Sequence, residues 1–527
     1  MNEASERVYS LENNEGQTLE VTFRVYNDGI AFKYGLKAIS DEEHIINEYT
    51  AYALPQGSKR WIQQYDPGYE KFFPLSTDGK LANRPEVDLW GYPALIEPRD
   101  SVFVLITEAN IRRGHCGSFL YNGDNRDNYQ VRLGDKKLAF SGVWESPWRL
   151  LIAGSLADIT ESTLVTDVSD PSKVEDTEWI KPGMVSWIYW AYNHGSQDYQ
   201  IVKEYIDLAV KMKWPYDQID WEWDVMRNGG NIQDAVKYAL SQGVKPLVWY
   251  NSSTNWIGPG PLFRLNKKAD REKEYKWLSD MGVAGIKVDF FSGDSVSTMN
   301  YYIDLLEDAV KYKLMLNFHG ATIPRGWQRT YPHMMSVEGV YGAEWYNNTP
   351  VLTNRAAEHN ATLPFTRNVV GPMDYTPGTF SDSQHPHITS YGHELALPII
   401  FESALQHMPD RPSVYYDMPE PVKKLLSDLP AAWDDTKLLT GYPGMEVVMA
   451  RRKGDVWYIA GINGTNKPRT LCFLLKDLSV VGKKITLFED GIYDRSFTIA
   501  EDLPLSEDEM SVEIKCLPRG GFVAVIK

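Results

Sequence analysis

The sequence predicts a multidomain protein in which a central (β/α)8 TIM barrel is flanked by an N-terminal β-sandwich and a C-terminal all-β domain. The chain has 527 residues, which is more than one hydrophobic core organises. Short β segments dominate both ends, whereas strand-like runs alternate with amphipathic helices at least five times in between. We expect the N-terminal β-sandwich to span 1–172, the barrel 173–428 and the C-terminal β-sandwich 429–527.

The N-terminal region consists of short segments typical of β-strands. TLEVTFRVY, GIAFKYGL, SVFVLITEA and NYQVRLG alternate in polarity or are rich in β-branched residues, and Gly, Asn and Asp separate them. This pattern is typical of a β-sandwich. The polar, acidic and proline-containing segment 166–183 then predicts a linker.

From residue 184 the hydrophobic period changes. Segment 197–214 carries Ile201, Tyr205, Ala209 and Met212 on one helical face. Strand-like runs occur at 184–190, 216–224, 244–251, 283–291, 313–320 and 333–340. Alternation of this kind predicts a parallel sheet, and a region of about 250 residues favours a closed barrel over an open sheet. We expect the last two strands near 363–371 and 403–409.

From about residue 430 the β pattern returns. MEVVMARR, DVWYIAGING and GGFVAVIK are examples of its strand-like segments. A region of this length is sufficient for a compact β domain of its own.

Composition excludes several classes of function. The formal net charge is −17, so the field of the protein repels phosphate backbones, and we expect neither nucleic acid nor anionic membrane as a partner. No apolar run reaches about 18 residues, so membrane insertion is not expected. Three cysteines without metal-ligand spacing exclude a disulfide framework and a cysteine-based zinc site. The aromatic content of 13 % suits stacking on sugars, although it suits plain cores equally well.

Catalytic groups of a barrel lie at the carboxyl ends of its strands. The predicted strands end in carboxylates, aromatic rings and amides, and there is no GxSxG, P-loop, HExxH or GxGxxG motif after a strand. Carboxylates within an aromatic pocket suit glycoside hydrolysis. The side chains at these ends are Asp220, Glu222, Asp224, Trp249, Tyr250, Asn251, Lys287, Asp289, Asn317, His319, Glu338 and, just beyond, Glu344.

Asp289 ends the apolar run GIKVDFF, where an ionised carboxylate is costly unless it has a partner or a function. Lys287 shares its strand face and would keep it ionised and nucleophilic. The alternative is a structural aspartate that pairs with Lys287 or caps the next helix.

The spacing of Glu338 and Glu344 is ambiguous by itself. Both could bind a hard cation such as Ca²⁺, or one could be a surface residue and the other structural. His319 could contact a sugar hydroxyl or orient a carboxylate, or it could be a satisfied core histidine. At least one of Asp220, Glu222 and Asp224 should reach the pocket.

These motifs resemble glycoside hydrolase family 97, a family of bacterial exo-acting α-glycosidases. The resemblance covers essentially the whole chain and rests on IDWEWD, GIKVDFF, NFHGA, RTYPHMMSVEGVYGAEW and LPAAWDDTKLL. The family has an inverting and a retaining branch. Inverting members carry a glutamate base directly after the histidine of the fifth strand, where this chain has Gly320. Retaining members have an aspartate nucleophile at the end of the fourth strand, where this chain has Asp289.

The resemblance also implies roles for other residues. Glu344 matches the general acid/base and Glu338 matches a Ca²⁺ ligand. Glu70, in DPGYEKFF, resembles a further ligand from the N-terminal domain. We therefore expect Asp289 and Glu344 to be catalytic and Glu70, Glu338 and Glu344 to bind Ca²⁺. The expected substrate-binding residues are Asp220, Lys287, His319 and Trp249.

Together these observations predict a retaining exo-acting α-glycoside hydrolase, with an α-galactoside as the favoured substrate. The alternatives are a β-L-arabinopyranosidase or α-glucosidase of the same fold, or a non-catalytic carbohydrate-binding protein. The partner is a small-molecule or oligosaccharide substrate, and the sequence leaves the oligomeric state open. We expect a soluble protein, periplasmic or secreted if an export signal was removed and cytoplasmic otherwise. The family's N-terminal domain is usually longer, so this sandwich is either naturally short or truncated and would expose an edge and an apolar face.

Overall fold

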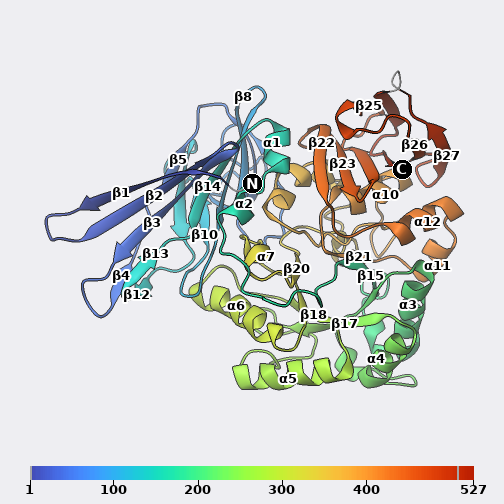
Figure 1. Cartoon of the computed structure of the whole chain (residues 1–527), viewed down its shortest axis with the longest axis horizontal. Coiled ribbons are helices and arrows are strands. Elements are labelled where there is room, and N and C mark those ends of the chain that lie inside the picture. Colours follow the sequence, from blue (N-terminus) through green and yellow to red (C-terminus); the bar gives the residue numbers. More distant parts are fainter. Residues whose placement is uncertain (1–2, 507–509) are drawn as a thin grey trace.

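The computed structural model describes residues 3–506 and 510–527. In Figure 1 the N-terminal β-domain (blue to cyan) and the C-terminal β-domain (orange to red) lie beside each other above a barrel of strands and helices (mainly green to yellow). The predicted fold class is confirmed. Within the described ranges, no helix combines the length and the apolar character that a membrane crossing needs.

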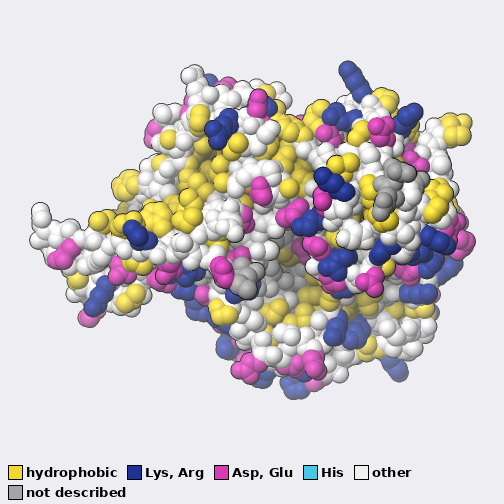
Figure 2. Space-filling model, turned by 45° about the horizontal axis from the view of Figure 1, so that its top comes forward, with side chains coloured by type: hydrophobic (Ala, Val, Ile, Leu, Met, Phe, Trp, Pro, Cys, Tyr) yellow, Lys and Arg dark blue, Asp and Glu magenta, His cyan; other side chains and the backbone are white. Residues whose placement is uncertain are grey.

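The N-terminal domain is built around a 12-stranded sheet of antiparallel pairs. Its elements are β1 (Ser5–Glu12), β2 (Thr18–Tyr26), β3 (Gly29–Lys37), β4 (Glu43–Ile45), β5 (Ala51–Ala53), β6 (Lys59–Gln64), β7 (Leu75–Ser76), β8 (Leu89–Arg99), β9 (Val102–Ala109), β10 (Ser118–Tyr121), β11 (Asn128–Leu133), β12 (Leu138–Phe140), β13 (Val143–Glu145), β14 (Trp148–Gly154), α1 (Leu156–Glu161) and α2 (Leu164–Asp167). The main strand order is β1-β2-β3-β14-β9-β8-β10-β11-β5. Strand β1 is an exposed edge, and Figure 2 shows hydrophobic side chains along the projecting strands.

The barrel strands are β15 (Gly183–Trp187), β16 (Tyr216–Ile219), β17 (Lys245–Asn251), β18 (Gly285–Asp289), β19 (Met315–Phe318), β20 (Met334–Val337) and β21 (Leu405–Met408). They form one parallel sheet in the order β20-β19-β18-β17-β16-β15-β21. One buried apolar cluster takes a side chain from each of six strands, which fills the barrel below the site: Val185, Tyr216, Leu247, Met315, Met335 and Leu405.

Helical segments connect and follow these strands. They are η1 (Gly195–Gln197), α3 (Tyr199–Met212), η2 (Trp223–Val225), α4 (Ile232–Ser241), α5 (Lys268–Met281), α6 (Val296–Val310), α7 (Trp327–Thr330), α8 (Trp345–Asn348), α9 (Ala356–Asn360), η3 (Leu363–Phe365), η4 (Arg367–Val370), α10 (Tyr391–Ile400), α11 (Pro412–Tyr416) and α12 (Glu420–Asp428).

The strand predicted near 363–371 is wrong, because η3 and η4 occupy that segment. The buried guanidinium of Arg367 lies at the seam between β20 and β21 instead and donates hydrogen bonds to the carbonyls of Val337 and Glu338. The amide of Asp374 also donates to Val337 O, and the amide of Met373 donates to Glu402 O. These side-chain and backbone donors satisfy carbonyls that an eighth strand would otherwise bind.

The C-terminal domain has a six-stranded sheet, in the order β22-β23-β24-β29-β26-β27, and a separate β25-β28 pair. Its elements are β22 (Asp435–Tyr442), β23 (Glu446–Lys453), β24 (Val456–Asn463), β25 (Arg469–Leu474), η5 (Lys476–Leu478), β26 (Lys484–Asp490), β27 (Phe497–Pro504), β28 (Ser511–Cys516) and β29 (Gly521–Ile526). A hydrophobic core of its own lies between the two sheets. Helix α10 of the barrel packs against β24 and β29.

A buried carboxyl on β16 links the stability of the barrel to pH. Asp217 lies opposite Ser186 of β15, and the Ser186 hydroxyl donates a hydrogen bond to it over 2.6 Å. Burial raises the pKa of Asp217 to about 7, although the Ser186 hydrogen bond acts in the opposite direction. The folded protein therefore holds this proton over a pH range in which the unfolded chain has lost it.

We predict that Asp217→Asn becomes more stable relative to the wild type as pH rises from 5 to 8. The raised pKa contributes stability that is fully present when the pH is below the pKa that Asp217 has in the unfolded chain. That stability is lost by up to about 1.4 kcal/mol per pH unit as pH rises from the unfolded pKa to the folded pKa of about 7. Thermal unfolding midpoints of both proteins at both pH values test this, because other titrating groups are common to the pair. An equal difference at the two pH values would contradict it.

Candidate active site

A cavity of about 340 Å³ opens at the carboxyl ends of the barrel strands. Six of the eight predicted site residues line it, namely Glu70, Asp220, Trp249, Lys287, Asp289 and Glu344. The other two, His319 and Glu338, are 1 % exposed and adjoin Glu344. A larger cavity of about 610 Å³ lies near the amino ends of β20 and β21, where the three domains meet, and none of the eight residues lines it.

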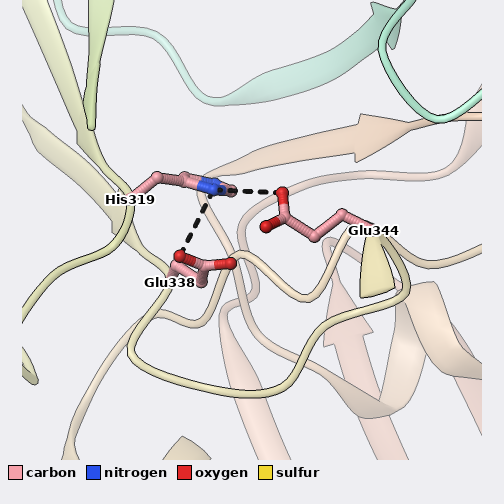
Figure 3. A group of neighbouring side chains, drawn as sticks. All are labelled: His319, Glu338 and Glu344. Atoms are coloured by element: carbon pink, nitrogen blue, oxygen red, sulfur yellow. Dashed lines mark ion pairs between the residues drawn. The ribbon is translucent and has the colours of Figure 1, made fainter. Parts of the chain in front are cut away.

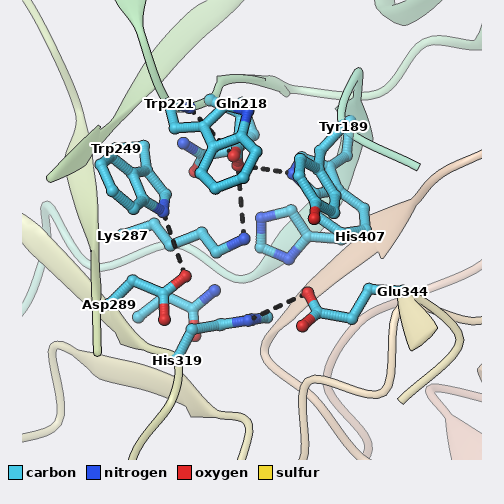
Figure 4. A network of polar contacts seen from close by, with 12 residues as sticks. Tyr189, Gln218, Trp221, Trp249, Lys287, Asp289, His319, Glu344 and His407 are labelled. Atoms are coloured by element: carbon cyan, nitrogen blue, oxygen red, sulfur yellow. Dashed lines mark hydrogen bonds and ion pairs between the residues drawn. The ribbon is translucent and has the colours of Figure 1, made fainter. Parts of the chain in front are cut away.

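Because the barrel strands are parallel, their register places the predicted site residues at the same height in the barrel. Trp249 of β17 is aligned with Lys287 of β18, and Lys287 is aligned with Asn317 of β19. Asp220 follows β16 directly and reaches the cavity, as expected of at least one acid in that segment. In Figure 4 the side chains of Lys287, Asp289 and Glu344 face a common space.

Asp289 is held by hydrogen bonds rather than by a salt bridge. The indole of Trp249 donates to its Oδ2 over 3.2 Å, and the amide of Phe290 donates to its Oδ1 over 2.8 Å. Phe290 has a φ of 69°, an uncommon conformation for a residue with a side chain. Burial raises the pKa of Asp289 to about 6, although Lys287 and His319 lower it. Asp289 does not cap the next helix, because Ser295 is the N-cap of α6.

Lys287 pairs with Asp220 across the pocket floor. Its Nζ lies 3.3 Å from Asp220 Oδ2, and the indole of Trp187 donates to the same oxygen over 2.7 Å. Burial disfavours the charge of Lys287, but Asp220 and the other site carboxylates outweigh burial and keep its pKa above the ordinary value. Lys287 is therefore a fixed cation beside Asp289.

Gly320 has no side chain, and this leaves room for the carboxylate of Asp289. Its φ is 47°, and a Cβ at this position would lie 2.9 Å from Asp289 Oδ1 and 2.9 Å from the amide nitrogen of Phe290. Both distances are shorter than a carbon makes with such atoms in folded proteins. A glutamate at position 320 is consequently incompatible with Asp289 as it lies here.

His319 is held in place by Asp374, an aspartate that the sequence did not indicate. Asp374 Oδ2 lies 2.7 Å from His319 Nε2 and 2.9 Å from His407 Nδ1, and the Asn317 amide donates to the same oxygen. Burial and Lys287 lower the pKa of His319, but Asp374 and Glu344 outweigh them and raise it to about 9. These two carboxylates therefore favour the protonated form of the ring in the free site. Asp374 follows an irregular segment, so no strand-end pattern could have indicated it.

The other ring nitrogen of His319 lies between two glutamates, as Figure 3 shows. His319 Nδ1 is 3.5 Å from both Glu338 Oε2 and Glu344 Oε2. Burial raises the pKa of Glu344, but His319 and Lys287 outweigh it and hold that pKa below the ordinary value. The charge of the free site therefore opposes a proton on Glu344.

Among the described residues, Glu70 has no cation within ion-pair distance, and Glu338 shares the His319 ring with Glu344 at 3.5 Å. Glu338 Oε2 accepts from the Gly320 amide over 2.6 Å, whereas its Oε1 is buried and has no hydrogen-bond partner among the residues described. The one hydrogen bond that the Glu70 carboxylate accepts from the described residues comes from the indole of Trp345 to Oε2, over 2.8 Å. Burial, and then the charge of Glu344, raise the pKa of both groups well above the ordinary value. His319, Glu338 and Glu344 offer atoms within 4.8 Å of one another, a spacing that could hold a metal ion.

A buried network fixes the loop that carries Glu70. Tyr69 has a φ of 57°, and its hydroxyl donates to Asp294 over 2.6 Å and accepts from Arg325 over 2.8 Å. Arg325 also pairs with Glu108 of β9 over 2.7 Å. The N-terminal domain is thereby tied to the barrel directly beside the site.

Two predicted strand-end acids lie outside the pocket. Glu222 contacts His194 and Gln197, and Asp224 lies beside Gly260. Aromatic residues that the sequence did not single out complete the walls instead: Tyr189, Trp221, Trp256, Phe290 and Trp345. They come mostly from loops, where spacing carries little information.

Three family models match the chain in succession. They are Glycosyl-hydrolase 97 N-terminal at 1–171, Glycoside hydrolase 97 at 182–340, and Glycosyl-hydrolase 97 C-terminal, oligomerisation, at 432–527. A protein of Streptomyces bingchenggensis described as "Probable retaining alpha-galactosidase" is 34 % identical over 469 residues, which cover 87 % of this chain and 70 % of that protein. A "Retaining alpha-galactosidase" of Bacteroides thetaiotaomicron is 29 % identical over 96 % of this chain and 83 % of its own length.

Solved structures agree with these matches. A crystal structure of a beta-arabinopyranosidase superposes with a TM-score of 0.92 at 30 % identity, covering 99 % of this chain and 87 % of that one. A family 97 enzyme of Pseudoalteromonas sp. strain K8, solved with panose, has the same fold, with a TM-score of 0.85 at 21 % identity over 100 % of this chain and 91 % of that one. The resemblance found in the sequence is thus confirmed, and the chain belongs to glycoside hydrolase family 97.

Proposed function

We propose that this glycoside hydrolase is a retaining, exo-acting α-galactosidase that forms a covalent glycosyl-enzyme on Asp289. The observation that carries the proposal is that the Asp289 carboxylate and a side chain at position 320 would occupy the same space. A Cβ at Gly320 would meet the Asp289 carboxylate, so this pocket accommodates a nucleophile at 289 rather than a base at 320. The names of the two curated relatives support the same assignment.

In the first step Asp289 attacks the anomeric carbon while Glu344 gives a proton to the departing glycosidic oxygen. The bond between the anomeric carbon and that oxygen breaks, and an ester bond to Asp289 forms. In the second step Glu344 takes a proton from water, whose oxygen attacks the same carbon and releases Asp289. This route needs only about 5–5.5 Å between the two carboxyl groups.

The surrounding residues prepare the nucleophile and hold the sugar. Lys287 favours the ionised form of Asp289, and the Trp249 indole holds its Oδ2. Asp220, Lys287 and Trp249 line the pocket and would contact sugar hydroxyls and the ring face. His319, held by Asp374, would orient Glu344.

The sugar is the part of the proposal with a specific competitor. A β-L-arabinopyranoside has the ring geometry of an α-galactoside and lacks only the C6 hydroxymethyl group. The structural similarity to a beta-arabinopyranosidase favours it as the second candidate. The ratio of kcat/KM for the p-nitrophenyl derivatives of the two sugars separates these candidates.

We also propose a Ca²⁺ site at Glu70, Glu338 and Glu344. Carboxylate oxygens suit this hard cation, and Glu338 Oε1 is a buried acceptor without a partner among the described residues. The raised pKa values of Glu70 and Glu338 indicate that their charges need compensation. When bound, Ca²⁺ would neutralise these charges and fix the loop that carries Glu344.

We predict that Asp289→Ala lowers kcat for p-nitrophenyl α-galactoside by roughly a thousandfold or more, because the covalent route is lost. Added azide should restore turnover by entering the vacated space and should yield a galactosyl azide. Asp224→Asn, an acid of the adjacent segment outside the pocket, is the control and should keep wild-type activity. Wild-type turnover by Asp289→Ala would remove the nucleophile assignment.

We further predict that a chelator lowers the thermal unfolding midpoint and that added Ca²⁺ restores it, because mutual repulsion of the buried acids returns without the ion. Glu338→Gln should weaken Ca²⁺ binding measured by calorimetry. Glu402→Gln, at a partly buried glutamate of the cavity at the opposite end of the barrel, should not. A midpoint that responds to neither chelator nor Ca²⁺, in a protein without bound metal, would contradict the site.

A further inference from the structure

The mouth of the catalytic pocket carries an aromatic surface that the proposed chemistry does not use. Trp256, in the loop after β17, lines the same cavity as Asp289 and Glu344, yet its side chain is 49 % exposed. Tryptophan is enriched at binding surfaces because its ring is apolar and its N–H is polar, and contiguous aromatic patches mark such surfaces more often than single exposed rings. Among the described residues, no hydrogen bond joins Trp256 to Asp289 or Glu344, the two carboxylates of the proposed reaction.

Neighbouring rings fix the plane of this indole. The ring of Phe290 meets it edge-on with centroids 4.7 Å apart, and the ring of Trp221 lies 6.0 Å away. Trp221 is itself held, because its indole donates to Asn193 O over 2.5 Å and His194 stacks on it. Trp256 is therefore part of a supported aromatic cluster and is not an isolated surface residue.

The loop backbone is fixed as well. The Asn251 side chain, 1 % exposed at the end of β17, donates to Trp256 O over 3.1 Å and to Pro259 O over 3.3 Å. A ring presented by a fixed backbone loses little conformational freedom when a ligand stacks on it. The surface is thus organised before any ligand arrives.

The polar groups and the exposed aromatic ring lie in different parts of the pocket, where two different parts of a substrate would bind. Asp220, Lys287 and Asp289 are buried at its floor, whereas Trp256 is at its exposed rim. A cavity of about 340 Å³ is at the small end of ligand pockets, so a sugar ring on the floor leaves the group beyond the cleaved bond at the rim.

We propose that Trp256, supported by Phe290 and Trp221, is the binding platform for the leaving group and selects leaving groups with a flat apolar face. Such a face is offered either by an aryl ring or by the C–H side of a second sugar ring. This proposal rests on the proposed function and adds the class of leaving group.

The test compares leaving groups of different size on one sugar. Trp256→Ala should lower kcat/KM for melibiose, for p-nitrophenyl α-galactoside, or for both by about tenfold relative to α-galactosyl fluoride, whose leaving group is one atom. A fall for melibiose alone identifies a sugar as the occupant, and a fall for the aryl substrate alone identifies an aromatic group. Trp256→Phe keeps a flat ring and should retain the wild-type ratios within about threefold.

Phe263→Ala is the matched control, because Phe263 is a 56 % exposed aromatic residue of the same loop that does not line the pocket. Its ratios should equal those of the wild type, and thermal midpoints verify that all variants are folded. Unchanged ratios in Trp256→Ala would overturn the platform while leaving the proposed function intact. A wild-type enzyme inactive on all three galactosyl compounds would overturn both.

Discussion

The arrangement of this site depends on the cost of gathering carboxylates in a buried pocket. Glu70, Asp220, Asp289 and Glu344 line one small cavity, and Glu338 lies against it. Ionised carboxylates are expensive away from water unless they are paired or hydrogen-bonded. The surroundings that compensate the charge differ from one carboxylate of the site to the next.

Two acids are compensated by the chain itself. Asp220 has Lys287, and Asp374 below the pocket has His319 and His407. Asp289 stands between these cations with hydrogen bonds and no direct salt bridge, so it remains a reactive group with a raised pKa. Among the described residues, Glu70 has no such partner, and Glu338 only shares the His319 ring with Glu344 while its Oε1 has no hydrogen-bond partner. This is the physical reason for proposing a cation there. Charge compensation therefore separates the roles of chemically similar side chains.

The same constraint explains why the N-terminal domain is part of the site. Glu70 reaches the barrel mouth from a loop whose Tyr69 is locked by Asp294 and Arg325. Arg325 is fully buried and also bonds Glu108, so separating the domains would leave a buried charge without its partner. The interface between these two domains is thus a precondition for the geometry of the site.

Much of this could be predicted from the sequence, because parallel strands bring their last residues to one edge. Asp289, Lys287 and Trp249 followed from that rule, whereas the roles of Glu344, Glu338 and Glu70 came only from the family resemblance. The supposed strand at 363–371 failed because nothing local reveals that Arg367 closes the seam. Asp374 and Trp256 lie in irregular segments, where only tertiary structure gives them neighbours. The domain boundaries and the roles of individual site residues stay predictions.

The central claim is that Asp289 becomes covalently attached to the sugar, which requires two displacements at the anomeric carbon. Proton NMR of p-nitrophenyl α-galactoside hydrolysis, recorded before mutarotation, tests it most directly. The account predicts that α-galactose appears first and converts to the β anomer only later. Release of β-galactose first would mean a single displacement by water and would contradict the account.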